Sequence, residues 1–460
     1  MEEQLAQVIA SAQVTNTFFA EAYYFLTIPL MLLIHVGFLS YEMGATRVKN
    51  VLSSGIKNLL AFAFTIVTFY FFGWWLYWAL PTGVTGSAGA LLTDLTGIAN
   101  ASAWALPWGG ASQYMGPNMG DHSDGVFWGA FALFAATTAS IASGALIERI
   151  QTAGFVILAI VLGSFAWIIA AAWGWHADGW LVTRWGFHDF GAAGCVHAVA
   201  GFFALGVLIN LGPRVGKFNA DGSANHIAGH NMMATVIGLL LIIVGFFGFL
   251  MACIILPGEA WSWYGGEGTT IYGTPMTLSA LGFNIVLAAS GGIIGAWAKT
   301  RDPFWMMSGA LAGIIAVASG LDIYFPSTVI VLSIIAGIII KPCAEWLESL
   351  GIDDAVGAVT IHGTIGLFGM IMLGILGSGY PALEAFVEAG TAATISFSGQ
   401  LVSAGVMFLV GFIPGYVISL LLKSVGMLRI PDAVQVQGLD IVKVPAQAFP
   451  EGMSSSDSDN

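Results

Sequence analysis

The chain has 460 residues, of which 57% are hydrophobic and only 8% charged, and its formal net charge at pH 7 is −13. A chain this apolar cannot form a water-soluble surface, which excludes a soluble globular protein and indicates an integral membrane protein. We therefore expect a lipid bilayer around the chain and no nucleic-acid partner.

The apolar runs are long and continuous and lack the alternating ten-residue rhythm of a membrane β-barrel, so they predict helices. The expected fold is an all-α integral membrane protein with eleven transmembrane helices. In chain order these spans lie near residues 19–41, 58–80, 126–147, 151–173, 189–211, 231–256, 275–298, 303–321, 325–342, 358–378 and 396–423. The Gly-, Ser-, Thr- and Pro-rich connection 81–124 is expected to form an external cap. We divide the chain into a membrane domain, 1–428, and a cytoplasmic C-terminal tail, 429–460.

The basic residues predict the orientation, because Lys and Arg accumulate in loops that stay in the cytoplasm. With eleven spans, twelve of the thirteen basic residues fall on one side: Arg47, Lys49, Lys57, Arg149, Arg214, Lys217, Lys299, Arg301, Lys341, Lys423, Arg429 and Lys443. Only Arg184 falls on the other side. The N-terminus is then outside and the C-terminus inside.

Two histidines lie within apolar runs and open the same pattern, H-x-x-x-G-x-F, at His197 and His362. An acidic residue precedes each, Asp189 by eight positions and Asp353 by nine. Polar groups at membrane depth are costly and normally face a bundle interior or a water-filled path. The offset places the histidines in the last spans of two five-helix halves, which predicts a five-plus-five inverted repeat followed by one C-terminal helix.

The inverted repeat would bring the two imidazoles together near the middle of the membrane. Neutral imidazole offers one donor and one acceptor, which suits a small neutral hydrogen-bonding solute. The alternative is that both histidines only pack and bond to serine or backbone. The cysteines Cys195, Cys253 and Cys343 are odd in number and widely spaced, so they suggest neither a disulfide framework nor a metal site, and we expect no cofactor.

Several motifs resemble those of the ammonium transporters of the Amt/Mep/Rh family, in particular its Amt branch. Residues 42–50 are similar to the family's E-x-G-x-x-R-x-K-N, and residues 144–149 to its G-A-x-x-E-R. The segments that contain the two histidines, 189–197 and 353–363, resemble D-F-x-G with V-H and the D-D and H-G pair. Residues 245–249 resemble G-W-F-G-F, and 428–440 the segment that closes the helical core.

The resemblance implies a multi-pass protein of the cell membrane that transports ammonium or ammonia and is not an enzyme. It implies a homotrimer with one narrow pore in each subunit, lined by His197 and His362. Phe134 and Phe249 would form an aromatic gate above them. The outer substrate site would comprise Trp173, Cys253, Phe246 and Asp189. Ammonium would be recruited there, deprotonated near the gate and conducted as ammonia, and a P-II-type signalling protein is a possible regulator.

The sequence departs from the family pattern at four places. Cys253 replaces a serine, Phe246 a tryptophan and Gly357 an acid, and the tail beyond Asp440 lacks an H-G-E cluster, which puts coupling through the tail in doubt. Two further functions stay open, an ammonium sensor with little or no transport and an Rh-like electroneutral gas channel. A membrane enzyme or a metal transporter is disfavoured, because two histidines without a thiolate at the same depth make a poor metal site.

Overall fold

The computed structural model describes residues 2–81, 122–176, 179–254, 277–380, 394–444, 446 and 448–449. Ten helical stretches in these ranges are long and apolar enough to cross a membrane, and Pro303–Ala318 is a shorter apolar helix. The prediction of an all-α membrane protein is therefore confirmed, and the eleven expected spans each coincide with one of these helices. Most of the expected external cap, and the end of the tail, lie outside the described residues.

Most helices begin and end within a few residues of the predicted positions, but α2 begins at Val51 rather than near residue 58, and α14 continues to Ser349 rather than ending near residue 342. Helix α1 begins at Glu2 rather than near residue 19, because residues 2–18 contain no Gly or Pro and the helix continues through them. The described elements are α1 (Glu2–Ala45), η1 (Val48–Asn50), α2 (Val51–Thr68), η2 (Phe69–Gly73), α3 (Trp74–Ala79), α6 (His122–Ala145), α7 (Thr152–Val161), η3 (Leu162–Ala166), α8 (Trp167–Gly174), α9 (Trp180–Trp185), η4 (Ala193–Ala198), α10 (Val199–Leu211), α11 (Met232–Ala252), α12 (Leu278–Thr300), α13 (Pro303–Ala318), α14 (Pro326–Ser349), η6 (Val359–Thr364), α15 (Ile365–Leu376), α16 (Phe397–Ser424), α17 (Asp432–Gln437) and α18 (Leu439–Lys443).

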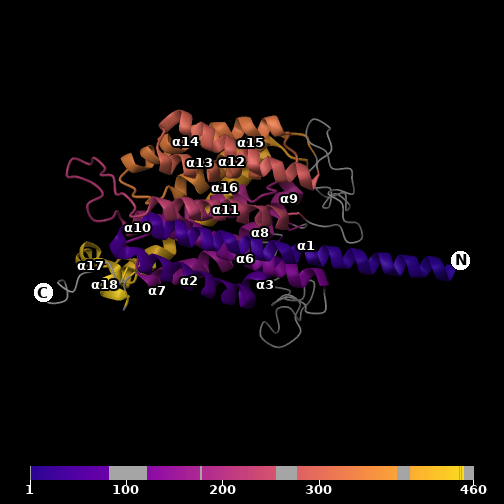
Figure 1. Cartoon of the computed structure of the whole chain (residues 1–460), viewed down its shortest axis with the longest axis horizontal. Helices are drawn as coiled ribbons and strands as arrows, with labels where there is room; N and C mark the ends of the chain where they lie inside the picture. Colours follow the sequence, from indigo (N-terminus) through magenta and orange to yellow (C-terminus); the bar gives the residue numbers. More distant parts are fainter. Residues whose placement is uncertain are drawn as a thin grey trace.

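The first and the last described helices, α1 and α18, reach opposite ends of the helical bundle (Figure 1). The N-terminal part of α1 projects beyond the bundle at one end, and α17 and α18 lie at the other, which we call the tail end. An odd number of membrane crossings requires this arrangement. The orientation relative to the cytoplasm stays a prediction from the basic residues.

The helices pair as an inverted repeat requires. The first helices of the two halves, α1 and α11, pack along each other. Near the centre, α10 of the first half meets η6 of the second, and η4 of the first half meets η6 and α15 of the second. Glycines permit the close approach of α1 and α11, since a Cβ on Gly37 would lie 2.6 Å from the carbonyl oxygen of Gly238. Small residues commonly allow helix backbones to come this close within membranes.

The tail docks on the loop between α1 and α2. The carboxylate of Asp440 accepts hydrogen bonds from the backbone N–H groups of Leu52 (2.9 Å) and Ser53 (2.8 Å), at the start of α2. The backbone N–H of Leu439 donates to the side chain of Asn50 at 2.9 Å. The start of α2 is thus capped by a residue from the far end of the chain, so the tail contacts the membrane domain without the missing H-G-E cluster.

Candidate functional site

Each of the two histidines lies on a π-helical segment whose start is capped by an aspartate. Asp189 accepts the backbone N–H groups of Gly194 (2.9 Å) and Cys195 (2.8 Å) at the start of η4, which carries His197. In the second half Asp354 accepts those of Ala358 (3.0 Å) and Val359 (2.7 Å) at the start of η6, which carries His362. π-Helical turns are rare and occur frequently at functional sites.

The equivalent of Asp189 is therefore Asp354, which lies eight residues before His362, and not Asp353 as the sequence motif suggested. Asp353 turns away from η6 and binds Arg214 instead. Asp189 and Asp354 therefore each lie eight residues before the histidine of the same half.

The glycine of the H-x-x-x-G pattern permits the two half-helices to cross. A Cβ on Gly201 would lie 2.2 Å from the backbone nitrogen of Gly363, and one on Gly366 would lie 2.4 Å from the carbonyl oxygen of Ala193. Neither distance is possible for a real side chain. The repeated motif therefore marks the point at which the halves touch, backbone against backbone.

The crossing brings the two imidazoles into contact. Nδ1 of His197 lies 3.0 Å from Nδ1 of His362, and the rings stack with an interplanar angle of 26°. The side chains are buried, with exposed fractions of 1% and 4% for the two residues. Because a hydrogen bond needs one donor and one acceptor, one of these nitrogens carries hydrogen and the other does not.

Three phenylalanines continue the line of rings from His197. The ring centroid of Phe249 lies 5.8 Å from that of His197, and that of Phe246 lies 5.9 Å away. Phe134 meets Phe249 edge to face at 4.4 Å. The structure thus brings together, as one stack across the middle of the bundle, the four residues that the family resemblance implied for a gate and a pore: Phe134, Phe249, His197 and His362.

Trp175, and not the expected Trp173, contacts this stack. The indole of Trp175 lies 5.3 Å from Phe134, and its N–H donates to the carbonyl oxygen of Asp189 at 2.7 Å. Trp173 packs against Trp180, and its indole N–H donates a hydrogen bond to the carbonyl oxygen of Leu80. Helix α8 ends at Gly174, so Trp175 has left the helix and its side chain does not follow the helical phase of Trp173.

The two other outer-site candidates are held by the backbone. The thiol of Cys253 donates to the carbonyl oxygen of Phe249, 3.3 Å away and one turn earlier in the chain. Asp189 is 2% exposed and also accepts the hydroxyl of Ser319 at 2.7 Å. Through these hydrogen bonds Asp189 holds the start of η4 in place.

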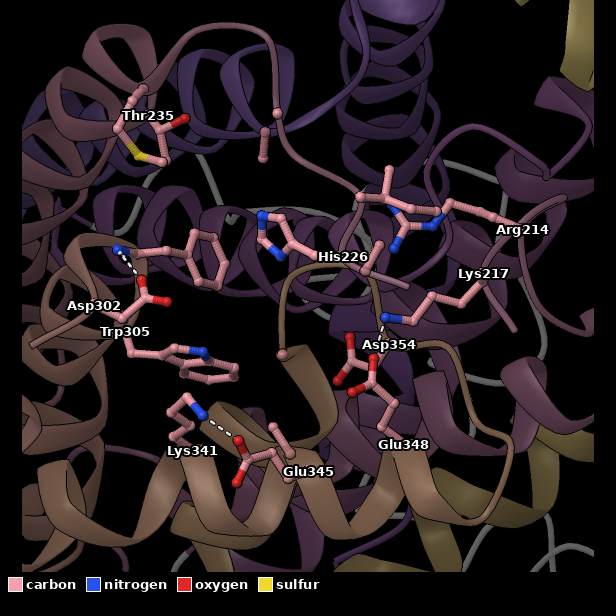
Figure 2. Close-up of a pocket in the computed structure, with 18 of the residues that line it drawn as sticks. Arg214, Lys217, His226, Thr235, Asp302, Trp305, Lys341, Glu345, Glu348 and Asp354 are labelled. Atoms are coloured by element: carbon pink, nitrogen blue, oxygen red, sulfur yellow. Dashed lines mark hydrogen bonds and ion pairs between the residues drawn. The ribbon is translucent and has the colours of Figure 1, made fainter. Parts of the chain in front are cut away.

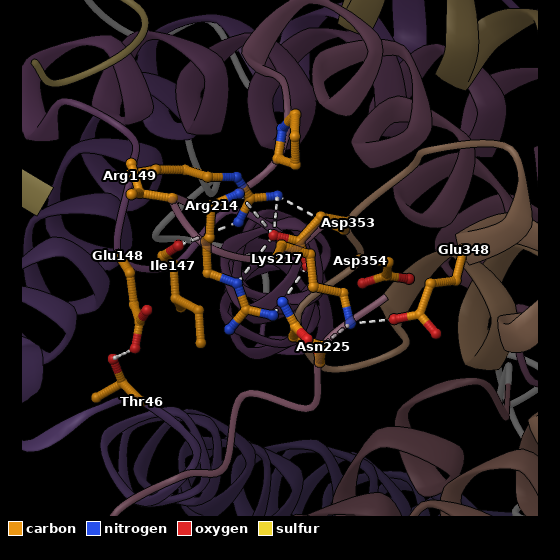
Figure 3. Close-up of polar contacts among 12 residues, drawn as sticks. Thr46, Ile147, Glu148, Arg149, Arg214, Lys217, Asn225, Glu348, Asp353 and Asp354 are labelled. Carbon is orange, nitrogen blue, oxygen red and sulfur yellow. Dashed lines mark hydrogen bonds and ion pairs between the residues drawn. The ribbon is translucent and has the colours of Figure 1, made fainter. Parts of the chain in front are cut away.

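At the tail end, a buried ionic cluster joins the two halves (Figure 3). The guanidinium of Arg214 binds both carboxylate oxygens of Asp353, at 2.9 and 2.8 Å, and Arg149 lies 3.8 Å from the same carboxylate. Burial alone raises the pKa of Asp353, but Arg149 and Arg214 outweigh it and hold the pKa well below its usual range. Asp353 is therefore a permanent anion that fastens the loop after α10 to the second half.

A polar cavity of about 350 Å³ opens beside this cluster (Figure 2). Charged side chains line it in pairs, Lys217 with Glu348 and Lys341 with Glu345. Asp354 also lines it, and burial raises the pKa of this carboxyl to about 6. Gly357, in the same wall, has φ +76°, which explains why a glycine replaces the expected acid there.

Within the described ranges, no group of three His, Cys, Asp or Glu side chains is arranged to hold a metal ion. The stack itself consists of imidazole and aromatic rings. Sequence reasoning missed Trp175, Asp354 and the buried side chain of Glu42, although Glu42 was part of the first motif. Asp354 belongs to the D-D pair of the sequence motif, but only its equal spacing with Asp189 distinguishes it from Asp353.

Comparison with known proteins places this geometry in context. A model described as Ammonium Transporter Family matches residues 22–449. The ammonium transporter Amt2 of Archaeoglobus fulgidus is 31% identical over 442 residues, covering 92% of this chain and 86% of that protein. The solved structure named Sensor Amt Protein is similar with a TM-score of 0.75 at 22% identity, covering 93% of this chain and 99% of that one. Mep2 of Saccharomyces cerevisiae is similar with a TM-score of 0.70 at 18% identity, covering 90% and 87%. At such identities the two structures show the shared fold.

Proposed function

Since the chain belongs to the ammonium transporter family, we propose that it moves ammonium across the cell membrane along the stack that runs from Phe134 to His362. Its apolar helices make it a multi-pass membrane protein. The observation that supports the path most strongly is the 3.0 Å contact between the two imidazoles, one of which comes from each half of the chain. Packing alone would not require two buried histidines to share one hydrogen bond.

The outer end of the stack suits recruitment of a cation. Trp175 and Phe134 present aromatic faces there, and an aromatic face attracts an ammonium ion by about 1 kcal/mol where water remains and by about 2 kcal/mol where it is excluded. The thiol of Cys253 is a weaker hydrogen-bonding partner than the usual serine. The aromatic faces therefore carry most of the recognition, and Trp173, Phe246 and Asp189 act by shaping the surroundings.

Beyond the phenylalanines the path favours ammonia over ammonium. Phe134 and Phe249 are fully buried and their rings touch, so a charged solute would lose its water there. The histidine pair offers one Nε2 acceptor and one Nε2–H donor, because the Nδ1 atoms share a single hydrogen. An uncharged ammonia molecule can exchange hydrogen bonds along this pair. The ammonium therefore passes one proton to water at the outer side of the gate and continues as ammonia.

We propose that the protein forms the homotrimer that the family resemblance implies. Because one chain already contains the whole stack, each subunit would have its own path. A P-II-type protein would meet the tail end, where the loop after α10 lines the cavity and the tail docks on the start of α2.

Uptake of labelled methylammonium and ammonium-driven current in proteoliposomes test the function. We expect uptake above that of empty vesicles. Current together with uptake would support electrogenic transport, whereas uptake without current would favour the electroneutral gas channel. Binding of ammonium without either signal would favour a sensor, the property named for the Sensor Amt Protein that shares the fold, and would refute the transport proposal.

A further inference from the structure

A second, much smaller cavity lies next to His362, between that residue and the large polar cavity. Its volume is about 20 Å³, enough for one molecule of the size of water or ammonia. Val356 and Ala358 line it, whereas Ala355 and Gly357 line the large cavity. The backbone of residues 355–358 therefore forms the wall between the two.

Glu42 of α1 lines the small cavity and has an exposed fraction of 0%. One of its oxygens, Oε2, is fully used. It accepts hydrogen bonds from Asn58 at 2.9 Å and from the hydroxyl of Ser143 at 2.8 Å, and the ammonium of Lys57 lies 3.5 Å away. These contacts tie α1 to α2 and α6, and they account for a structural role of the carboxylate through Oε2 alone.

The other oxygen, Oε1, has no hydrogen-bond partner within the described part of the chain. Gly144, which lines the same cavity, leaves space near it, since a Cβ there would lie 3.6 Å from Oε1 and 2.6 Å from Cγ2 of Val356. A buried carboxylate oxygen without a donor is costly. The small cavity is thus the place from which a donor can reach Oε1.

The rest of the lining fits a small cation. Phe38 and Tyr41 contribute aromatic rings, and the ring of Phe38 lies 6.5 Å from that of His362. Lys57 does not compete for Oε1, because its ammonium donates to the carbonyl oxygen of Ser143 at 3.0 Å and lies 5.0 Å from the centre of the Phe155 ring. A carboxylate oxygen with aromatic faces is a ligand set for an ammonium-type ion.

We propose that this cavity is an inner cation site, in which Oε1 of Glu42 and the rings of Phe38 and Tyr41 bind one ammonium ion on the tail side of His362. The identity of the ion rests on the proposed transport function. The carboxylate, the rings and the cavity do not depend on it. The site would hold the ion between the histidine pair and the large cavity.

Thallium(I), a cation of the size of ammonium, tests the site directly in crystals of the full chain. We expect an anomalous peak within coordination distance of Oε1 in the wild type. Glu42→Gln, which removes the charge, and Gly144→Ala, which fills the space, should abolish the peak. Ser143→Ala is the matched control, because it removes a donor to Oε2 and leaves Oε1 in place, so the peak should remain. A wild type without the peak, or a peak retained in Glu42→Gln, would overturn the inference.

Flux in oriented proteoliposomes separates this inference from the proposed function. For Glu42→Gln we expect the half-saturating ammonium concentration on the tail side to rise about tenfold or more, the effect of losing one charge-assisted hydrogen bond. The value on the opposite side should stay unchanged. A wild type that binds thallium at Glu42 but carries no ammonium would refute transport and leave the inner site standing. Equal effects on both sides, or none on either, would refute the inner site.

Discussion

Asp189 and Asp354 occupy equivalent positions in the two halves of the bundle. Each lies eight residues before a buried histidine, and each accepts two backbone N–H groups at the start of the helical segment that carries it. Their surroundings differ. Asp189 is buried and receives the hydroxyl of Ser319, whereas Asp354 is half-buried and lines the polar cavity at the tail end.

The raised pKa of Asp354 predicts a pH dependence of stability. Its pKa of about 6 in the folded protein exceeds the ordinary 3.8, so the folded state binds the proton more tightly than the unfolded state. The resulting stabilisation is complete below pH 3.8 and is lost as the pH rises through about 6. We therefore expect the melting temperature of the wild type to fall over this window relative to that of Asp354→Asn.

Thermal unfolding of the two proteins in detergent, from pH 4 to pH 8, measures the difference. Asp353 does not confuse the result, because its pKa lies well below the usual range and it stays ionised throughout. A difference in melting temperature that is constant over the whole range, or that changes in the opposite direction, would contradict the assignment to Asp354.

The crossing glycines predict a sharp contrast between two similar substitutions. Gly201→Ala would place a Cβ 2.2 Å from the backbone of Gly363, which cannot yield without moving η6. We expect loss of folded protein, measured as the monodisperse fraction in size-exclusion chromatography. Gly405→Ala, on α16, has nothing within 4 Å of the new Cβ. This control should gain up to about 1 kcal/mol, since alanine favours a helix over glycine.

The sequence could predict the helices and the histidine pair because both depend on patterns that repeat. Apolar runs of membrane length mark the spans, and the repeated H-x-x-x-G-x-F marks the crossing of His197 and His362. The sequence could not predict which of two nearby residues of the same type takes a given position in the site. Whether Trp173 or Trp175 meets Phe134 depends on the end of α8 at Gly174, and whether Asp353 or Asp354 caps η6 depends on where the backbone turns toward Arg214.

The role of Glu42 was equally hidden from the sequence. The motif of residues 42–50 does not indicate that Oε2 of Glu42 is fully hydrogen-bonded and Oε1 is not, because the hydrogen-bond donors come from α2 and α6. Only the folded bundle brings Asn58 and Ser143 to the same carboxylate. Sites assembled from several helices in this way have no spacing to detect.

The placement of Trp175 predicts an outer-site phenotype. Trp175→Leu should raise the half-saturating external ammonium concentration about tenfold, because it removes an aromatic face worth about 1–2 kcal/mol to a cation. Trp173→Leu is the matched control, since that indole packs on Trp180 away from Phe134. We expect a smaller effect there in the same uptake assay. A larger effect of Trp173→Leu than of Trp175→Leu would contradict this prediction and indicate that Trp173 belongs to the outer site.

The docked tail predicts a stability effect far from the path. Asp440→Ala removes the cap of α2 and should cost about 1–2 kcal/mol, seen as a lower melting temperature and faster proteolysis of the tail. Asp432→Ala is the control, because Asp432 is exposed and its pair with Arg429 contributes under about 1 kcal/mol. Equal effects of the two substitutions would mean that the bonds to Leu52 and Ser53 add nothing.

The shared hydrogen bond between His197 and His362 predicts that their substitutions do not add. Replacing either ring by alanine removes the same contact, so His197→Ala, His362→Ala and the double variant should lower ammonium-driven current to similar extents. His35→Ala is a control for loss of a buried imidazole, because that ring lies beside Thr137 and Ser140, outside the stack. Its current should stay near that of the wild type once expression is matched. Losses that multiply in the double variant would show that each histidine acts alone, and the line of two rings would then no longer explain conduction.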